Sequence, residues 1–558
     1  MKRPKIVATT VVAGSLALTL GTAGAAFAHP ASPAGARTEA TAASAHRPAV
    51  AKDDSYLVTA GRRLSSHGSV LRNDSGSATI VSHTTTAHGT LSLAQDGSFT
   101  YQPDAGFTGV DSFDYTTNDA VKLYDTDLKP LATIGGVKIT GGAYGSSFTP
   151  VPGSKTEFYG LTDRGPNVTA ADGTTKIEPL PSFDPAIGKF KLAGTKAVLE
   201  KRIPLRAADG HAYNGLVSTE ASTGETIEDL DGNVLPKSPY GYDSEGLVAL
   251  RDGTFWVSDE YGPYITHFDR TGRQIERLSP LDGTLPAELA QRVANKGMEG
   301  LTVTPDGKTL VGIMQSALQT PDLAAKPSKV APVRIVTYDL RTHRTHEYLY
   351  LLTDPKTNSG AVSEITALSA TRFVVDERDG AFEPNAFKRL YEIDLAGATD
   401  VGPSSTVAGA RYDASRGGLL VGPSQQSIEA FAGTADTATA TTLLGGVEIA
   451  PVSKEIDVDL GALLTRLDPT GGFFGHDKVE GVATTDGGTT LVVSNDNDFG
   501  IDGVTNTEAP YALHAKTLPD GTQDDGQYLS IDTTRVDDAS STATVSIFVT
   551  PRDVHGFH

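Results

Sequence analysis

The sequence predicts an all-β protein that consists of a six- or seven-bladed β-propeller and a small β-sandwich. Three observations predict this fold class. A unit of strand, tight turn and strand, opened by a glutamate, recurs through the middle of the chain. Short runs of β-branched and aromatic residues, separated by turn residues, fill residues 51–120. An apolar period of 3.6 residues, which is typical of helices, occurs only at residues 286–296.

The first 28 residues have the three-part pattern of a signal peptide. A basic head precedes an apolar run at residues 6–20, and residues 26–28 provide the small side chains at which signal peptidase cuts. The apolar run is shorter than the ~20 residues that a membrane span needs. Residues 29–50, which are rich in Ala, Pro and Ser, are expected to form a flexible leader. We therefore expect a secreted, extracellular protein with no membrane anchor.

The composition of the 558-residue chain excludes several kinds of chemistry. There is no cysteine, which removes disulfides, thiolate metal sites and a cysteine nucleophile. The formal net charge of −21 argues against a nucleic-acid partner, because phosphate backbones are held by basic surfaces. The side chains of a functional site are therefore expected to bind or react through oxygen and nitrogen atoms.

Residues 51–121 are predicted to form the sandwich. Two strand-like runs, residues 89–93 and 98–101, flank the pair Asp96-Gly97, which is typical of a hairpin turn. Together with residues 106–115, this stretch resembles the cadherin-like, Ig-like repeat of bacterial secreted and surface proteins. In that family a last strand that alternates Ser or Thr with Val follows directly, and here it is missing.

The missing strand has a candidate at the far end of the chain. Residues 538–551 alternate polar and apolar side chains in the same way. We therefore predict that both chain ends build one sandwich and that the propeller, residues 122–537, is inserted into its last loop. The alternative is that residues 540–551 form the last strand of the large domain.

The propeller is predicted from the repeated unit. In its first copy, residues 245–250 and 254–259 are two strands joined by Asp252-Gly253. The glutamates that open the copies are 54, 65 and 116 residues apart, and the last spacing equals two units of 58. A period in the fifties fits a blade of four strands with its loops, so residues 122–537 allow six or seven blades.

The repeated glutamates predict a metal site. The first strand of each propeller blade borders the central channel, so a residue type that recurs there is brought into one ring. Carboxylates that lie close together cannot all stay ionised without a compensating cation, and oxygen ligands favour a divalent ion such as Ca²⁺. The alternative is that each glutamate binds backbone amides and closes its own blade. The predicted metal ligands are Glu245, Glu299, Glu364 and Glu480.

Further charged residues lie next to the repeats. Basic groups beside a carboxylate-lined channel suit a small anionic substrate, although surface salt bridges are the alternative for each of them. The predicted substrate-binding residues are Asp163, Arg164, Lys296, Arg378 and Lys478. The predicted catalytic residues, which would orient a water molecule or protonate a leaving group, are Asp259, Asp376 and Asp496.

Several motifs resemble one known family. Residues 159–167, 242–247, 256–263, 295–301 and 478–482 are similar to the "esterase-like activity of phytase" family, which is related to the β-propeller phytases. The resemblance covers residues 134–499. It implies a secreted, metal-dependent phosphoric-ester hydrolase that acts on phytate or simpler phosphomonoesters.

Two other functions stay open at this point. A sugar lactonase of the gluconolactonase type is also a propeller with a metal site built from Glu, Asn and Asp. A non-catalytic binding or adhesion propeller is the other possibility, with the sandwich contacting a cell surface or wall. A serine esterase of the α/β-hydrolase type is not supported, because the G-x-S-x-G motif is missing from the sequence.

Overall fold

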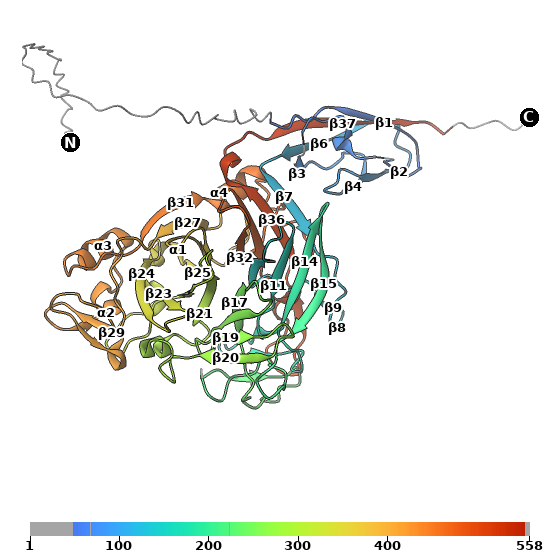
Figure 1. The fold of residues 1–558 in the computed structure, drawn as a ribbon. Coiled ribbons are helices and arrows are strands. Elements are labelled where there is room, and N and C mark those ends of the chain that lie inside the picture. Colours follow the sequence, from blue (N-terminus) through green and yellow to red (C-terminus); the bar gives the residue numbers. More distant parts are fainter. Residues whose placement is uncertain (1–47, 67, 77, 222–223, 553–558) are drawn as a thin grey trace, which may run out of the picture. The chain divides into compact units, whose positions relative to one another are not determined.

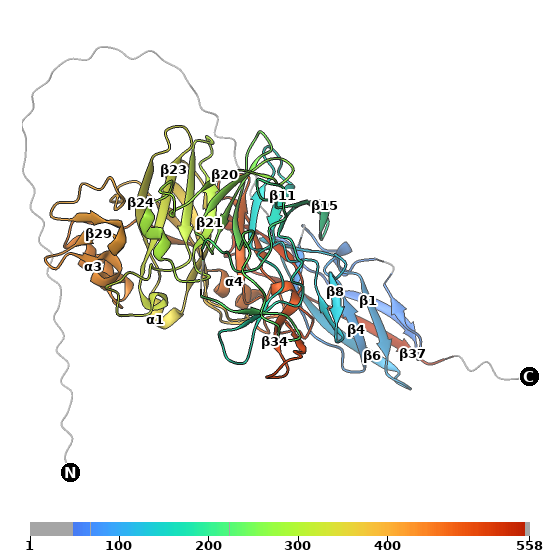
Figure 2. The same cartoon turned by 90° about the horizontal axis from the view of Figure 1, so that it is seen from below.

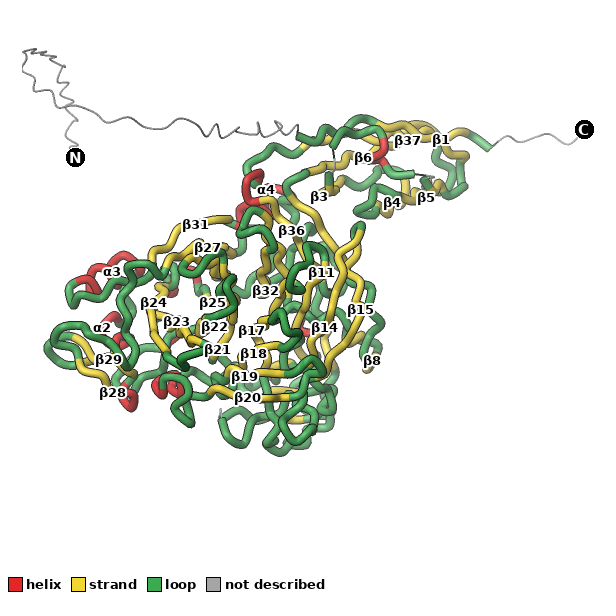
Figure 3. The backbone as a smooth tube through the Cα atoms, in the orientation of Figure 1, coloured by secondary structure: helices red, strands yellow, loops and turns green. Residues whose placement is uncertain are grey.

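Strands are far more common than helices in the computed structural model, which describes residues 48–66, 68–76, 78–221 and 224–552 (Figure 3). The predicted signal peptide and most of the predicted leader lie outside these residues. Among the described residues, no helix is both long and apolar enough to cross a membrane. The predicted all-β class, with a propeller and an Ig-like sandwich, is confirmed.

Within the described residues, the propeller has five four-stranded antiparallel blades (Figure 1). The first blade consists of β10 (Ser147–Pro150), β11 (Glu157–Leu161), β14 (Ala186–Ala193) and β15 (Lys196–Pro204). The second blade consists of β17 (Ser244–Ala249), β18 (Phe255–Asp259), β19 (Ile265–Phe268) and β20 (Gln274–Leu278). The third blade consists of β21 (Met298–Val303), β22 (Thr309–Met314), β23 (Pro332–Asp339) and β24 (Thr345–Leu351). The fourth blade consists of β25 (Ala361–Ala367), β26 (Arg372–Arg378), β27 (Lys388–Asp394) and β31 (Ser453–Val458). The fifth is β32 (Val479–Thr484), β33 (Thr490–Asn495), β36 (Gln527–Asp532) and β7 (Val121–Asp125).

The ring is closed by strands from distant parts of the chain. The inner strands contact one another in the order β10, β17, β21, β25, β32 and back to β10. The outer strand of the fifth blade, β7, comes from the N-terminal side and pairs antiparallel with β36. A parallel contact between Lys196 and Asp125 joins β15 to β7, so the first and fifth blades form one eight-stranded sheet.

The predicted number of six or seven blades is wrong for the described chain. The 116 residues between Glu364 and Glu480 hold one blade, because the segment between β27 and β31 forms a side layer instead of a blade. This layer lies beside β24 (Figures 1 and 2). It consists of β28 (Arg411–Asp413), β29 (Gly418–Val421), β30 (Gln426–Ser427), α2 (Ile428–Ala432) and α3 (Thr437–Gly445).

The glycine that follows most of the repeated glutamates lets the inner strands approach closely. A Cβ atom on Gly246 would lie 2.5 Å from the backbone nitrogen of Leu301 in the next blade. A Cβ atom on Gly300 would lie 2.6 Å from the nitrogen of Ile365. These positions therefore require glycine for packing around the axis.

The sandwich contains strands from both chain ends. One sheet has the order β1 (Asp54–Thr59), β37 (Ser541–Thr550), β6 (Gly109–Asn118) and β3 (Thr79–His83). The other has the order β2 (Leu64–Ser65), β5 (Phe99–Pro103) and β4 (Gly89–Leu93). Strand β37 runs antiparallel to β6 and parallel to β1, and its Val545 and Ile547 are fully buried in the sandwich core. The domain boundaries that we drew at residues 121 and 537 stay a prediction.

A chain that ends at Asp537 tests this division. We expect it to lose the sandwich and keep the propeller, because β37 supplies the strand between β1 and β6. Limited proteolysis with mass spectrometry would show this as cleavage confined to residues 48–118. Cooperative unfolding of residues 49–121 expressed alone would contradict the shared sandwich.

Smaller two- and three-stranded sheets support the cavity described below, and three of their strands contribute residues to its lining. They are β8 (Ala132–Ile134) with β9 (Val137–Ile139), β12 (Val168–Thr169) with β13 (Lys176–Ile177) and β16 (Ile227–Glu228), and β34 (Ile501–Val504) with β35 (Leu513–Ala515). Ile139, Ile177 and Phe499 pack in one apolar cluster beneath them. This packing holds Val168, Lys176 and Ile501 at the cavity.

Candidate functional site

A cavity of about 390 Å³ gathers most of the charged residues that the sequence singled out. Its carboxylates are Asp163, Asp243, Glu245, Glu260, Glu299, Asp477, Glu480, Asp496, Asp498 and Asp502. Its basic residues are Arg164, Lys176, Lys296, Arg378 and Lys478. Acidic groups thus outnumber basic groups by ten to five. The cavity therefore favours a cation, and an anion can bind only when a cation offsets part of the negative charge.

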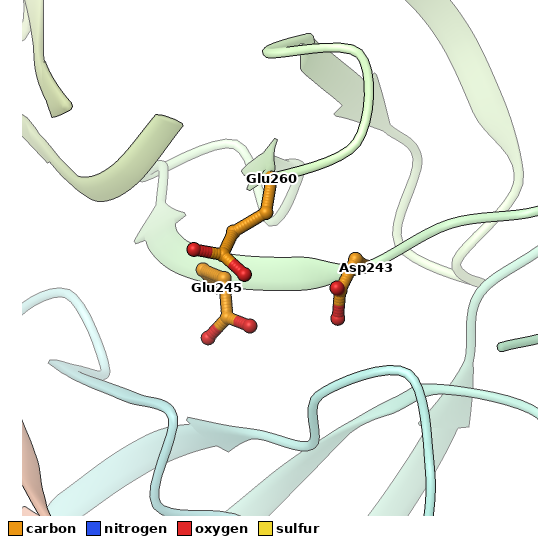
Figure 4. A group of neighbouring side chains, drawn as sticks. All are labelled: Asp243, Glu245 and Glu260. Carbon is orange, nitrogen blue, oxygen red and sulfur yellow. The ribbon is translucent and has the colours of Figure 1, made fainter. Parts of the chain in front are cut away.

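Three of these carboxylates form a tight cluster beside β17 (Figure 4). One oxygen each of Asp243, Glu245 and Glu260 lies within 4.8 Å of the other two. Asp243 and Glu245 are two residues apart at the start of β17, and Glu260 directly follows β18. Asp243 is only 2% exposed, and its Oδ2 accepts no hydrogen bond from any residue that the structure describes, although Arg164 Nε lies 3.9 Å away. The cluster therefore offers oxygen ligands that the described side chains do not satisfy.

Burial makes the charged forms of this cluster costly. It raises the pKa of Asp243 to about 7, although Arg164 opposes the rise. The pKa values of Glu245 and Glu260 lie well above their usual range, first because of burial and then because of the negative charge of Glu299. Without a cation, burial therefore favours the protonated forms of these three carboxylates, and a divalent ion would compete with the protons.

Gln315 links this cluster to Glu299. Its Nε2 donates to Glu260 Oε1 and to Glu299 Oε2, at 2.9 Å each, and its Oε1 accepts from Lys296 Nζ. This pattern uses both hydrogens of one amide and fixes the two carboxylates relative to each other. The sequence analysis missed Gln315. The available signal was its place one residue after the second strand of its blade, where Glu260 stands in the preceding blade.

The structure brings together three of the four predicted metal ligands. Glu245, Glu299 and Glu480 all line the cavity. Glu364 does not, because its carboxylate accepts hydrogen bonds from Ser147 Oγ at 2.5 Å and from the backbone nitrogens of Leu301 and Ile365. For Glu364 the geometry favours the alternative, in which a glutamate satisfies backbone amides and ties blades together.

The predicted substrate-binding residues all line the cavity, but its bases already have acidic or polar partners. Arg378 is paired with Glu480, and Lys296 donates to Gln315. Arg164 lies 3.5 Å from Glu225 and donates to Asn167. An anion that enters the cavity must therefore share these bases with the carboxylates.

Lys478 belongs to a second charged group at the cavity. Its Nζ lies 3.0 Å from Asp496 Oδ2 and 2.6 Å from Asp498 Oδ1. Lys516, which the sequence analysis missed, bonds the other oxygen of Asp498 and lies 2.6 Å from Asp477. Burial opposes the charge on Asp498, but the two lysines hold the pKa of Asp498 well below its usual value. The two lysines of this group thus face three aspartates, Asp477, Asp496 and Asp498.

Of the predicted catalytic residues, only Asp496 lines the cavity. Asp259 is fully buried and accepts from the backbone nitrogens of Asp243 and Gly262, so it positions the segments that carry the acidic cluster. Asp376 is also fully buried, and neither of its oxygens has a hydrogen-bond partner within the described part of the chain. Neither of these two aspartates is placed to touch a substrate in the cavity.

Comparison with known proteins assigns the chain to a family. A family model described as "esterase-like activity of phytase" matches residues 139–499, and a bacterial Ig domain model matches residues 46–128. The chain belongs to the phytase-like family. In this phytase-like chain the matched region carries the acidic cluster, Gln315 and most of the cavity lining.

One curated relative of the phytase-like chain is described as an uncharacterized secreted protein of Arthroderma benhamiae. It is 30% identical over 259 residues, which are 38% of this chain and 49% of the relative. The chain thus spans about half the length of this relative.

Solved structures similar to the phytase-like chain are distant. A putative oxidoreductase (glucose dehydrogenase) from Thermus thermophilus is 11% identical, covers 82% of this chain and 99% of its own, and has a TM-score of 0.28. The calcium-binding protein regucalcin from Agrobacterium tumefaciens is 11% identical, covers 66% and 90%, and has a TM-score of 0.23. Neither likeness says anything about the chemistry of the phytase-like site.

Proposed function

We propose that the protein is a secreted, divalent-metal-dependent hydrolase of phosphoric monoesters. The observation that carries the proposal is the cluster of buried Asp243 and Glu260 with half-buried Glu245 in the wall of a cavity that also holds basic residues. Membership of the phytase-like family supports the reaction class. The signal-peptide pattern of residues 1–28 and the secreted relative support the location outside the cell.

The donor set fits a hard cation such as Ca²⁺. All three ligand groups are carboxylates, and Asp243 Oδ2 is a buried oxygen without a hydrogen-bond partner among the described residues. Asp243, Glu245 and Glu260 would hold the ion, and Gln315 would fix the orientation of Glu260. When bound, such an ion polarises a phosphoryl oxygen and lowers the pKa of a bound water molecule.

The bases and acids of the cavity supply the remaining chemistry. Lys478 and Arg378 would neutralise the charge of the phosphate group and release part of their contact with Asp496 and Glu480. Burial raises the pKa of Glu480 to about 8, and Asp496 adds to the rise, so Glu480 keeps a proton at neutral pH.

In the proposed reaction, one cavity carboxyl group accepts a proton and another donates one. Water attacks phosphorus and gives one proton to Asp496, while the bond between phosphorus and the ester oxygen breaks. The leaving oxygen takes the proton of Glu480 and departs as an alcohol.

Phosphate release from p-nitrophenyl phosphate and from phytate, measured with calcium and with EDTA, tests the proposal. We expect turnover that EDTA abolishes and that Glu260→Gln lowers by about 100-fold. Glu364→Gln is the matched control, because its carboxylate lies outside the cavity lining. Turnover that is insensitive to EDTA would contradict the proposal. Hydrolysis of gluconolactone without phosphate release would indicate the lactonase, and no turnover on either substrate would indicate a binding propeller.

A further inference from the structure

Three large apolar side chains stand exposed side by side on the sandwich. Leu57 is 68% exposed, Val110 is 58% exposed and Phe548 is 45% exposed. In the register of the sheet, Leu57 of β1 lies opposite Phe548 of β37, and Phe548 lies opposite Val110 of β6. The three residues therefore form one continuous line across three neighbouring strands, which we call the apolar row.

Hydroxyl groups border the apolar row on both sides. Because side chains two residues apart on a strand share a face, the next row consists of Ser55, Ser546 and Ser112, which are also paired across the strands. On the other side Thr59 lies opposite Thr550. None of these eight residues carries a charge.

The apolar row has no part in the sandwich core. The core is made by the opposite face of the same strands, where Val545, Ile547 and Phe113 are at most 1% exposed. Single exposed apolar residues are common, but adjacent ones that remain in water are typical of a binding surface.

The size of this surface and the net charge of the chain indicate which kind of partner it binds. A stable protein interface takes roughly 800 Å² and 20–30 residues from each side, far more than these eight residues provide. The formal net charge of −21 repels a second copy of the chain and an anionic lipid surface. An uncharged ligand that combines apolar ring faces with many hydroxyl groups matches an apolar row between two rows of hydroxyls.

We propose that the apolar row and its flanking hydroxyls bind a neutral polysaccharide. Leu57, Phe548 and Val110 contact the apolar faces of successive sugar rings, and the serines and threonines bond their hydroxyls. This surface would hold the propeller at an insoluble polymer. The inference is independent of the reaction proposed for the cavity.

Co-sedimentation of the full chain with insoluble cellulose and with insoluble chitin tests this proposal. We expect the native chain to bind at least one polymer and the triple variant L57T/V110T/F548T to bind at least ~10-fold more weakly. Threonine keeps the preference for strands, and an unchanged melting temperature would show that the sandwich is intact. Ile275→Thr is the matched control, because Ile275 is a 56% exposed strand residue of the propeller.

Three outcomes would overturn the proposal. The first is that neither polymer retains the native chain. The second is that the triple variant binds as well as the native chain. The third is that analytical ultracentrifugation shows a dimer that the triple variant dissociates, which would make a second copy the occupant.

Discussion

We expect calcium to raise the melting temperature of the native chain, and we expect the replacement of Asp243 by Asn together with Glu260 by Gln to abolish this rise. An ion that binds only the folded state stabilises it by about 2.7 kcal/mol when its concentration is 100 times the dissociation constant. The double variant removes two of the three clustered carboxylates, so most of this stabilisation should disappear. Thermal unfolding with EDTA and with increasing calcium, and in parallel with magnesium and manganese, measures the effect.

Glu364→Gln separates this effect from general damage to the propeller. The Glu364 carboxylate is bonded by Ser147 and by two backbone amides, so its loss should lower the melting temperature without changing the calcium-dependent rise. An unchanged rise in the double variant would show that the cluster beside β17 does not hold the ion.

Replacing Asp376 by Asn is expected to reduce the loss of stability between pH 5 and pH 9. Burial raises the pKa of Asp376 to about 8, whereas an aspartate in an unfolded chain titrates near 4. Between these values the folded state holds a proton that the unfolded state has released. The stabilisation is therefore complete below pH 4 and is lost as the pH rises through about 8. Each pKa unit corresponds to about 1.4 kcal/mol, so the effect should reach a few kcal/mol.

Urea unfolding at pH 5, 7 and 9 with saturating calcium measures this dependence, because calcium bound at the proposed site would reduce the contribution of the acidic cluster. The native chain should lose stability over this range, and Asp376→Asn should lose less. Asp231→Asn, which changes an exposed aspartate, should behave as the native chain does. An equal loss in the native chain and in Asp376→Asn would contradict this account of Asp376.

The glutamate repeat predicted the propeller and three of the residues that meet in its cavity. Glu245, Glu299 and Glu480 open the inner strands of their blades, and the symmetry of the ring brings equivalent positions together. The blade number was wrong because the side layer between β27 and β31 also contains short strands and turns. Counting residues cannot distinguish such an insertion from a blade.

The residues that bond to the predicted site residues could not be predicted from the sequence. Gln315 and Lys516 reach the charged groups from loops whose course depends on the packing of several blades. Glu364 is the fourth residue of β25, whereas Glu245, Glu299 and Glu480 are the second residues of their strands, and its carboxylate turns to Ser147 and the backbone. Because successive side chains of a strand point to opposite faces, a shift in strand position decides whether a carboxylate faces the cavity or the next strand.

The sequence alone determined the strands, their turns and the family of this protein, because strand periodicity and turn residues act over a few neighbours. Only the tertiary structure decided the number of blades, the cluster of Asp243, Glu245 and Glu260, and the partner of each cavity base, such as Glu480 for Arg378. These features depend on distances between residues far apart in the chain. The strength of charge interactions depends on the distance between the charged side chains, and the pKa of a carboxylate depends on its burial. Both are fixed only when the blades close into a ring, so the chemistry of the site depends on the folded propeller.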